Sequence, residues 1–336
     1  MENKKLVLLT GAGGFIGSHV LSHLLKNTNH DIVCICSWKH RGMPFRILDD
    51  ENYKNNKNRV KIITHDLVSP LTEDVKFRVG NPDIIINIAS ESHVDRSITD
   101  PVIFIQNNVN LILNVLEFAR EVKPEVFLQF STDEVYGQAP LGLNHKEWSP
   151  IVPSNPYSAS KAAQEAIAVA YWRTYGVPLI LTNTMNAFGE RQDLEKFIPL
   201  CIERIKEGKK ISIHSYPDGK TAGSRFYIHA RNIADALNFI IDNVKPTLYP
   251  DVDLPERLNI VGEKEVDNLT LAELIAKFVG KPLIYEMVNF HSSRPGHDCR
   301  YALDGAKLAN LGWKPKVSFE ESLERTVKFQ LNNGCN

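Results

Sequence analysis

Short apolar runs alternate with amphipathic segments along the first half of the chain. Runs rich in Val, Ile and Leu predict strands at residues 6–10, 32–36, 60–63, 83–88, 126–130 and 179–183. Their nearly continuous apolarity is typical of parallel strands that are buried on both faces. Helical periodicity predicts helices between them, notably at residues 15–26, 102–122 and 158–175. Repeated strand–helix units predict an α/β fold built on a doubly wound parallel sheet.

The pattern changes after about residue 185. Turn-rich segments at 215–223 and 246–255 separate shorter elements, and residues 269–280 have the pattern of an amphipathic helix. We expect residues 1–184 to form the sheet domain, with part of 224–262 interleaved, and residues 185–336 to form a smaller α/β domain. The Asn/Lys-rich segment 52–58 is predicted to be a solvated loop.

Composition limits the partners of the chain. The 336 residues are 43% hydrophobic, which is enough for a sizeable core, and the formal net charge is −1. That charge provides no general attraction for nucleic acid or an anionic membrane. No apolar run approaches the roughly 18 residues of a membrane span, and the stretch at 6–9 is too short for a signal peptide. The five scattered cysteines predict reduced thiols and a cytoplasmic protein.

A glycine-rich turn joins the first strand to the first helix. Gly11, Gly14 and Gly17 follow the strand directly, and Phe15 and Ile16 open the helix. Glycines at this spacing give a tight turn, close approach to a pyrophosphate, and close helix–strand packing. The exposed N–H groups and the helix dipole then favour an anion. Ordinary glycine turns are the alternative, but the flanking strand and helix favour a dinucleotide site.

The second strand lacks the acid that commonly binds the adenosine ribose. Cys36 occupies the expected position, and Ser37, Lys39 and Arg41 follow it. Without a carboxylate nothing repels a 2′-phosphate, and Lys39 and Arg41 could pair with one. The cofactor is therefore NAD or NADP, and this turn favours NADP. The alternative is a solvated turn with NAD bound. Asp66, after the third strand, is placed to accept a hydrogen bond from adenine.

Tyr157 and Lys161 lie one helical turn apart at the start of a long predicted helix. We expect the ammonium and a nearby cofactor to lower the pKa of the phenol, so that a tyrosinate serves as a base. Two other Tyr-x-x-x-Lys matches begin at Tyr53 and Tyr216. The first lies in the predicted loop, and the second contains Pro and Gly, which disfavour a helix.

Two adjacent carboxylates follow the fifth strand, in the triplet Thr132, Asp133 and Glu134. Residues just past the carboxyl end of a parallel strand face the ligand crevice. Like charges in a dehydrated cleft raise the pKa of one of them, which yields an acid beside a base. The alternative is a solvated loop with a turn-forming Asp.

Together these motifs resemble the extended short-chain dehydrogenase/reductase family, and most closely its dTDP-glucose (nucleotide-sugar) 4,6-dehydratases. The similarity covers nearly the whole chain and includes the segments 89–97, 155–161, 195–199 and 294–298. It implies a Rossmann-type sheet with a smaller C-terminal α/β substrate domain. The acid pair is the most specific part, because related 4-epimerases typically carry Ser or Ala there.

The resemblance implies a role for each catalytic candidate. Tyr157 takes the proton of the sugar's carbon-4 hydroxyl as hydride leaves for the nicotinamide, and Thr132 steadies that hydroxyl. Glu134 removes the hydrogen on carbon 5, and Asp133 protonates the carbon-6 hydroxyl, which leaves as water. Lys161 holds the nicotinamide ribose. The reduced cofactor then returns its hydride to carbon 6, and the product is a 4-keto-6-deoxy sugar.

The resemblance also implies binding residues and no metal. For the cofactor they are Gly11, Gly14, Phe15, Ile16, Gly17, Ser37, Lys39, Arg41, Asp66, Leu67, Ala89, Tyr157 and Lys161. For a nucleotide-diphosphate hexose they are His93, Asn186, Glu195, Lys196, Arg225 and Arg294, of which Asn186 and the two arginines match diphosphate positions. The usual Arg-Asp-Trp stretch is Arg225-Phe226-Tyr227 here, which leaves UDP or dTDP and the sugar open.

Three other readings stay open: a 4-epimerase, a 5,6-dehydratase, and a non-catalytic dinucleotide-binding protein. The helix at 102–122 is apolar around much of its circumference, so one face can pack on the sheet and another on a partner helix. The resemblance implies a homodimer, in which this helix and the one beginning at Tyr157 form a four-helix interface.

Overall fold

The computed structural model describes residues 4–39, 41–289 and 298–334. Its centre is a seven-stranded parallel sheet in the order β11-β6-β5-β4-β1-β2-β3. The strands are β1 (Leu6–Thr10), β2 (Asp31–Cys36), β3 (Val60–Thr64), β4 (Ile84–Asn87), β5 (Val126–Thr132), β6 (Leu179–Thr184) and β11 (Glu256–Ile260). Every strand predicted from the apolar runs has its counterpart, and the predicted doubly wound fold is confirmed.

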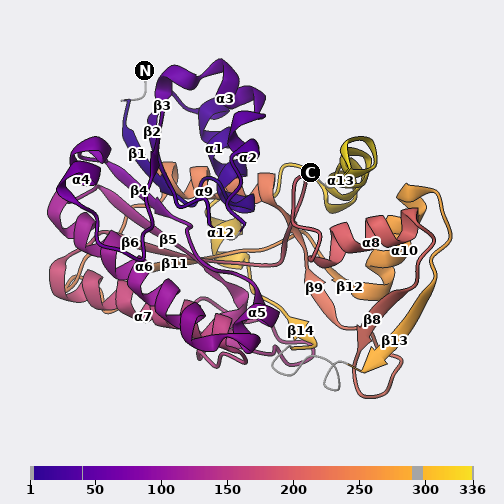
Figure 1. Cartoon of the computed structure of the whole chain (residues 1–336). Helices are drawn as coiled ribbons and strands as arrows, with labels where there is room; N and C mark the ends of the chain where they lie inside the picture. Colours follow the sequence, from indigo (N-terminus) through magenta and orange to yellow (C-terminus); the bar gives the residue numbers. More distant parts are fainter. Residues whose placement is uncertain (1–3, 40, 290–297, 335–336) are drawn as a thin grey trace.

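Helices cover both faces of this sheet (Figure 1). One face packs against α1 (Phe15–Asn27), α9 (Ala230–Asn243) and α12 (Ala306–Asn310). The other packs against α4 (Glu73–Val79), α6 (Pro101–Val122) and α7 (Pro156–Tyr175). The central strands are buried on both sides, which explains their continuous apolarity.

The Asn/Lys-rich segment is not the predicted loop. It forms α3 (Glu51–Asn55) and a 3-10 turn (Lys57–Arg59), just after the short helix α2 (Phe45–Leu48). Asp50 caps α3, because its carboxylate accepts a hydrogen bond from the Tyr53 N–H at 3.1 Å. The polar composition of this segment does not indicate a helix, and the capping aspartate is the feature that starts one.

A second lobe follows β6 (Figure 1). Its core lies between its strands and three helices, α8 (Phe197–Lys206), α10 (Asn268–Val279) and α13 (Phe319–Asn333). The predicted helix at 269–280 is α10, which ends at Gly280 with φ +75°. The lobe's strands are β8 (Ile211–Ser215) with β13 (Tyr285–Asn289), and β9 (Ser224–Phe226) between β12 (Glu265–Asp267) and β14 (Arg300–Tyr301).

The chain crosses between the two lobes more than once. After β6 it enters the smaller lobe, and it returns to the sheet with α9 and β11. At the crossing, β7 (Ala187–Phe188) pairs with β10 (Ile228–His229). The domain boundary at residues 184/185 stays a prediction.

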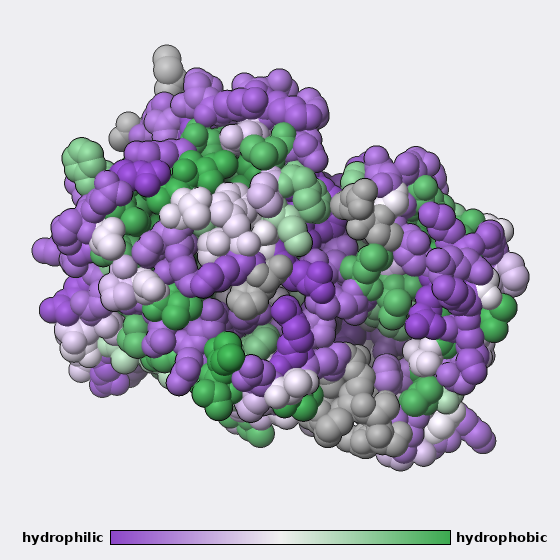
Figure 2. All heavy atoms as spheres, in the orientation of Figure 1, coloured by the Kyte–Doolittle hydropathy of each residue, from purple (hydrophilic) through white to green (hydrophobic). Residues whose placement is uncertain are grey.

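In the described part of the chain, α6 is the one helix long and apolar enough to cross a membrane by length and composition. Ile112, Val115, Leu116 and Ala119 of this helix are buried against the sheet, so packing in the core accounts for much of its apolarity. The four described cysteines are buried free thiols. Figure 2 shows a largely hydrophilic face with separate hydrophobic patches.

Candidate active site

A cavity of about 320 Å³ opens at the carboxyl ends of the central strands. The sheet order reverses at β1, which lies between β4 and β2, and ligands of open α/β sheets bind at such a switch point. The cavity brings together every described residue predicted for the site except Arg225. These are Gly11, Gly14, Phe15, Ile16, Gly17, Ser37, Lys39, Arg41, Asp66, Leu67, Ala89, His93, Thr132, Asp133, Glu134, Tyr157, Lys161, Asn186, Glu195 and Lys196.

Gly11 and Gly17 of the glycine turn have no room for a side chain. Gly11 has φ +74°, and a Cβ on Gly17 would lie 2.1 Å from the Gly11 carbonyl oxygen. Gly14 is the N-cap of α1 and carries no side chain to occupy its first N–H groups. This turn therefore fits the pyrophosphate of a dinucleotide at the positive end of α1.

Cys36, Lys39 and Arg41 all line the cavity beside this turn. The Cys36 sulfur accepts hydrogen bonds from the N–H groups of Gly13 and Ala12, while burial raises the pKa of its thiol to about 11. Lys39 forms an ion pair with Asp66. Arg41 forms one with Glu195 at 2.9 Å. Both cations thus already have acidic partners.

Trp38 was missed by sequence reasoning. A Cβ on Gly13 would lie 2.8 Å from the Trp38 ring, so the indole packs directly on the glycine turn. Its Nε1–H donates to the Thr64 hydroxyl at 2.9 Å. An aromatic residue in a cation-rich turn was the only available signal.

The triplet lies where β5 ends and a 3-10 turn (Asp133–Tyr136) begins. The Thr132 hydroxyl donates to Asp133 Oδ1 at 2.9 Å and accepts from the Glu134 N–H at 3.3 Å. Burial, followed by the charge of Glu134, raises the pKa of Asp133 to about 7. Asp133 Oδ2 is buried without a hydrogen-bond partner among the described residues. The expectation of one raised carboxyl pKa is confirmed.

Glu134 lies among hydrogen-bond donors. Its Oε2 accepts from Asn155 Nδ2 and from the Tyr301 hydroxyl, each at 3.4 Å. Such donors favour the ionised form of a carboxyl group. Tyr301 comes from β14 in the smaller lobe, and no sequence pattern indicates this contact.

A capping box begins α7 and fixes Tyr157 in its first turn. The Asn155 side chain accepts from the Ser158 N–H at 2.9 Å, and the Asn155 N–H donates to the Ser158 hydroxyl at 3.1 Å. Tyr157 is buried and shares a hydrogen bond with the Thr132 hydroxyl. The phenol therefore lies beside the acid pair.

The expectation that the Lys161 ammonium and a nearby cofactor lower the pKa of Tyr157 stays a prediction, because it includes the charge of a bound cofactor. Burial raises the pKa of the phenol far above its usual range, and the negative charge of Glu134 adds to the shift. The Lys161 ammonium instead donates to the Phe130 carbonyl at 2.8 Å and to Gln164 Oε1 at 2.7 Å. Burial lowers the pKa of Lys161 to about 8.

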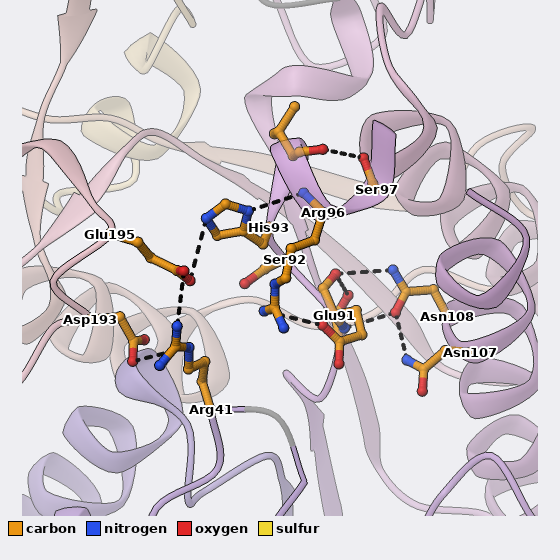
Figure 3. Close-up of polar contacts among 12 residues, drawn as sticks. Arg41, Glu91, Ser92, His93, Arg96, Ser97, Asn107, Asn108, Asp193 and Glu195 are labelled. Carbon is orange, nitrogen blue, oxygen red and sulfur yellow. Dashed lines mark hydrogen bonds and ion pairs between the residues drawn. The ribbon is translucent and has the colours of Figure 1, made fainter. Parts of the chain in front are cut away.

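Three segments meet at the mouth of the cavity. Figure 3 shows Arg41, which follows β2, and His93, which follows β4, both directed at Glu195. The His93 Nε2 lies 3.3 Å from Glu195 Oε1. Burial lowers the pKa of both His93 and Lys196. Asn186 Oδ1 is buried and has no hydrogen-bond partner among the described residues.

Arg225 is the exception among the predicted residues. It does not line the cavity. Its guanidinium donates to the carbonyls of Ser224, Cys299 and Asp298, each at 2.7 Å, and lies 4.6 Å from the Tyr301 ring centroid. Arg225 thus supports the wall that carries Tyr301, and its predicted contact with a diphosphate stays a prediction. The predicted Arg294 lies outside the described residues.

Comparison with known proteins agrees with this architecture. Residues 8–326 match the family model described as GDP-mannose 4,6 dehydratase. The chain is 35% identical to the dTDP-glucose 4,6-dehydratase of Salmonella typhimurium, covering 97% of this chain and 93% of that protein. It is also 35% identical to the low-salt glycan biosynthesis protein Agl12 of Haloferax volcanii, covering 97% and 99%.

Solved structures show the same fold. A double mutant of DesIV, a dTDP-glucose 4,6-dehydratase from Streptomyces venezuelae with NAD and DAU bound, has a TM-score of 0.86 at 29% identity, covering 98% and 97%. The UDP-glucose 4-epimerase of Thermus thermophilus in complex with NAD has a TM-score of 0.84 at 26% identity, covering 98% and 99%. The fold and site define an extended short-chain dehydrogenase/reductase. Within that class, the chain belongs to the GDP-mannose 4,6-dehydratase family.

Proposed function

We propose that this protein is a nucleotide-sugar 4,6-dehydratase that converts a dTDP- or UDP-hexose to its 4-keto-6-deoxy derivative. The observation that carries the proposal is the meeting of Asp133, Glu134, Thr132 and Tyr157 in one cavity beside the glycine turn. Dehydration across carbons 5 and 6 needs an acid and a base, and the raised pKa of Asp133 suits the acid. Relatives named dTDP-glucose 4,6-dehydratase support the same reaction.

A nicotinamide dinucleotide fits the cradle formed by Gly11, Gly14 and Gly17. When bound, it supplies a hydride acceptor and a positive charge at the nicotinamide ring. We propose NAD and not NADP, because the two cations that favoured NADP are already paired with acids. Solved relatives with NAD bound support this choice.

Tyr157 and Thr132 act on the carbon-4 hydroxyl. Tyr157 takes the proton of that hydroxyl as a tyrosinate, a form that burial disfavours and that the hydrogen bond with Thr132 favours. The Thr132 hydroxyl bonds to both Tyr157 and Asp133, which orients the sugar oxygen between them. Lys161 stabilises the negative charge that develops on the Tyr157 oxygen, and it holds the ribose attached to the nicotinamide ring.

Asp133 and Glu134 carry out the elimination. With a pKa of about 7, Asp133 is protonated in a large fraction of molecules at neutral pH and can donate its proton to the leaving carbon-6 hydroxyl. Glu134, which accepts hydrogen bonds from Asn155 and Tyr301, can accept the proton of carbon 5 as the carboxylate. The two adjacent carboxyls therefore take opposite roles.

We assign the nucleotide sugar to the side of the cavity formed by the lobe that begins near residue 185. Asn186, Glu195 and Lys196 of that lobe line the cavity, as does His93, and the Asn186 amide and the Lys196 ammonium can contact a diphosphate. Arg225 acts indirectly in this proposal, by supporting Tyr301.

The proposal includes a homodimer in the cytoplasm. Val102, Ile103 and Ile105 on α6 and Tyr175 on α7 are exposed apolar side chains on two neighbouring helices. Pairing α6 and α7 with those of a second copy buries them. Light scattering at micromolar concentration tests the dimer, and a monomer contradicts it. The buried free thiols suit a reducing compartment.

Turnover of a panel of UDP- and dTDP-hexoses by purified protein tests the function. Mass spectrometry detects the loss of one water, and proton NMR detects the 6-methyl, 4-keto product. A product of unchanged mass identifies a 4-epimerase, a reading supported by the Thermus structural relative. An exocyclic alkene identifies a 5,6-dehydratase. Absence of turnover with every sugar contradicts the enzymatic proposal.

A further inference from the structure

A row of buried polar side chains runs beneath the cavity. It comprises Thr10 at the end of β1, Asn87 of β4, Gln129 of β5, and Gln164 and Lys161 of α7. All five are buried. Polar groups in such a position are costly unless they are hydrogen-bonded to one another.

The members of the row bond in sequence. Thr10 Oγ1 donates to Asn87 Oδ1 at 2.6 Å, and Asn87 Nδ2 donates to Gln129 Oε1 at 2.8 Å. Gln129 Nε2 donates to Gln164 Oε1 at 3.4 Å, and the Lys161 ammonium donates to the same oxygen at 2.7 Å. The row therefore joins the residue before the glycine turn to the lysine under the opposite end of the cavity.

The orientation of Gln164 is fixed by its second bond. Its Nε2 donates to the Asn108 carbonyl of α6 at 2.8 Å. Because that carbonyl can only accept, the amide oxygen of Gln164 must point at Lys161. Lys161 gives its second N–H to the Phe130 carbonyl at 2.8 Å. An ammonium has three donors, so one N–H of Lys161 is left for a ligand in the cavity that it lines.

Neutral acceptors hold the charge of Lys161. Among the charged and titratable groups that the structure describes, Glu165 on the same helix is the one whose charge acts on it. Glu165 is itself bonded to Arg257 at 2.6 Å and to Asn183 at 2.7 Å. Burial disfavours the ammonium, and the amide oxygen of Gln164 is one of the two acceptors that offset this cost.

We propose that Gln164 is a positioning residue for Lys161, which directs the remaining ammonium N–H at the nicotinamide ribose and keeps Lys161 charged. The row from Thr10 ties this placement to the turn that receives the pyrophosphate. The inference rests on the proposed function, in which Lys161 binds that ribose.

Calorimetry on protein freed of cofactor tests the proposal, with NAD⁺ and ADP as probes, since ADP lacks the nicotinamide ribose. For Gln164→Leu we expect NAD⁺ affinity to fall about tenfold and ADP affinity to stay unchanged. Gln330→Leu is the matched control, because Gln330 is a buried amide that bonds to Pro199 and Glu203 in the smaller lobe. It should leave both affinities unchanged.

The pH dependence of NAD⁺ affinity gives a second readout. The charged lysine binds the ribose, and that charge is lost as pH rises through its pKa. Gln164→Leu removes an acceptor, so the fall in affinity should move to lower pH. Gln164→Glu keeps the size of the side chain and the acceptor for Lys161 but loses the donor to the Asn108 carbonyl. It adds a negative charge and should move the fall to higher pH.

Two outcomes overturn the proposal: equal weakening of NAD⁺ and ADP binding in Gln164→Leu, or an unshifted pH dependence in Gln164→Glu. If Gln164→Leu does not fold, the direction of the Gln164→Glu shift decides alone. Failure of the proposed function has a different signature, because the wild-type protein would then turn over no nucleotide sugar while these binding results held.

Discussion

The Tyr301 hydroxyl lies 3.4 Å from Glu134 Oε2, so a side chain of the smaller lobe reaches the acid pair at the end of β5. Tyr301 is buried beneath the Arg225 guanidinium. The base of the proposed elimination is thus completed only when both lobes are in contact. That relationship makes the smaller lobe part of the chemistry.

Removing this contact should slow the elimination. For Tyr301→Phe we expect kcat to fall about tenfold, which corresponds to the loss of one hydrogen bond to a charged group. Steady-state kinetics with the best nucleotide sugar measures it. Tyr285→Phe, at a half-exposed position on β13, is the control. Equal kcat values for the two variants would remove Tyr301 from the mechanism.

Replacing Tyr157 tests the proton transfer at carbon 4. Tyr157→Phe should reduce turnover about 10³-fold, a typical loss for general acid–base catalysis. The ring still fills its place against Phe104, so cofactor binding should persist. Turnover assays and calorimetry check the two parts. Turnover at the wild-type rate would rule out the proposed role.

Asp133 should set the pH dependence of the elimination. Its carboxyl has a pKa raised to about 7, and the reaction needs it protonated. The elimination rate should therefore be high below pH 7 and fall as pH rises above it, because the acid loses its proton. Single-turnover rates measured across pH check this fall in the elimination rate above pH 7.

Asp133→Asn should abolish the fall in elimination rate with rising pH, because an amide cannot donate the proton. Oxidation at carbon 4 should continue, so reduced nicotinamide should accumulate in a single turnover. If the variant keeps the wild-type rate and pH dependence, Asp133 is not the acid.

Cofactor choice can be measured directly. Because Lys39 and Arg41 are paired with Asp66 and Glu195, we expect NAD⁺ to bind more tightly than NADP⁺ in calorimetry. Lys39→Ala should leave NAD⁺ affinity nearly unchanged, since exposed ion pairs contribute roughly 0–1 kcal/mol. Tighter binding of NADP⁺, lost in Lys39→Ala, would instead favour a 2′-phosphate site.

The buried ion pair between Arg257 and Glu165 should matter for stability. Its atoms lie 2.6 Å apart and both side chains are almost fully buried. Arg257→Met should lower the free energy of unfolding by about 3–5 kcal/mol, because it leaves a buried carboxylate without its cation. Arg120→Met, which breaks an exposed pair with Glu117, should cost about 0–1 kcal/mol. Denaturant unfolding compares the two, and equal losses would contradict the argument.

The sequence was informative where contacts are local. Apolar runs predicted the strands, and the spacing of Gly11, Gly14 and Gly17 predicted the turn, because each pattern follows from neighbouring residues. Tyr157 and Lys161 were rightly expected on one helix, but the partners of Lys161 come from β5 and from Gln164 within the core. Spacing alone does not reveal burial, so the rise in the pKa of Tyr157 that burial causes was not expected.

Long-range contacts were out of reach. Arg225 was expected at a diphosphate by resemblance, yet it bonds to backbone carbonyls of residues 298 and 299. Tyr301 reaches Glu134 across 167 residues of sequence, and no periodic pattern predicts such a pairing. The prediction of a loop at 52–58 was wrong for a local reason. The polar composition indicated a loop, and the single capping aspartate that starts a helix there was given too little weight.

The return of the chain to the sheet with β11 has a consequence for dissecting the molecule. β11 pairs with β6 along five residues and closes that side of the sheet. A fragment ending at residue 184 would therefore present β6 as a bare hydrogen-bonding edge, which invites aggregation. Limited proteolysis and fragment expression should accordingly yield no stable, soluble N-terminal fragment. Engineered variants should therefore keep the two lobes together.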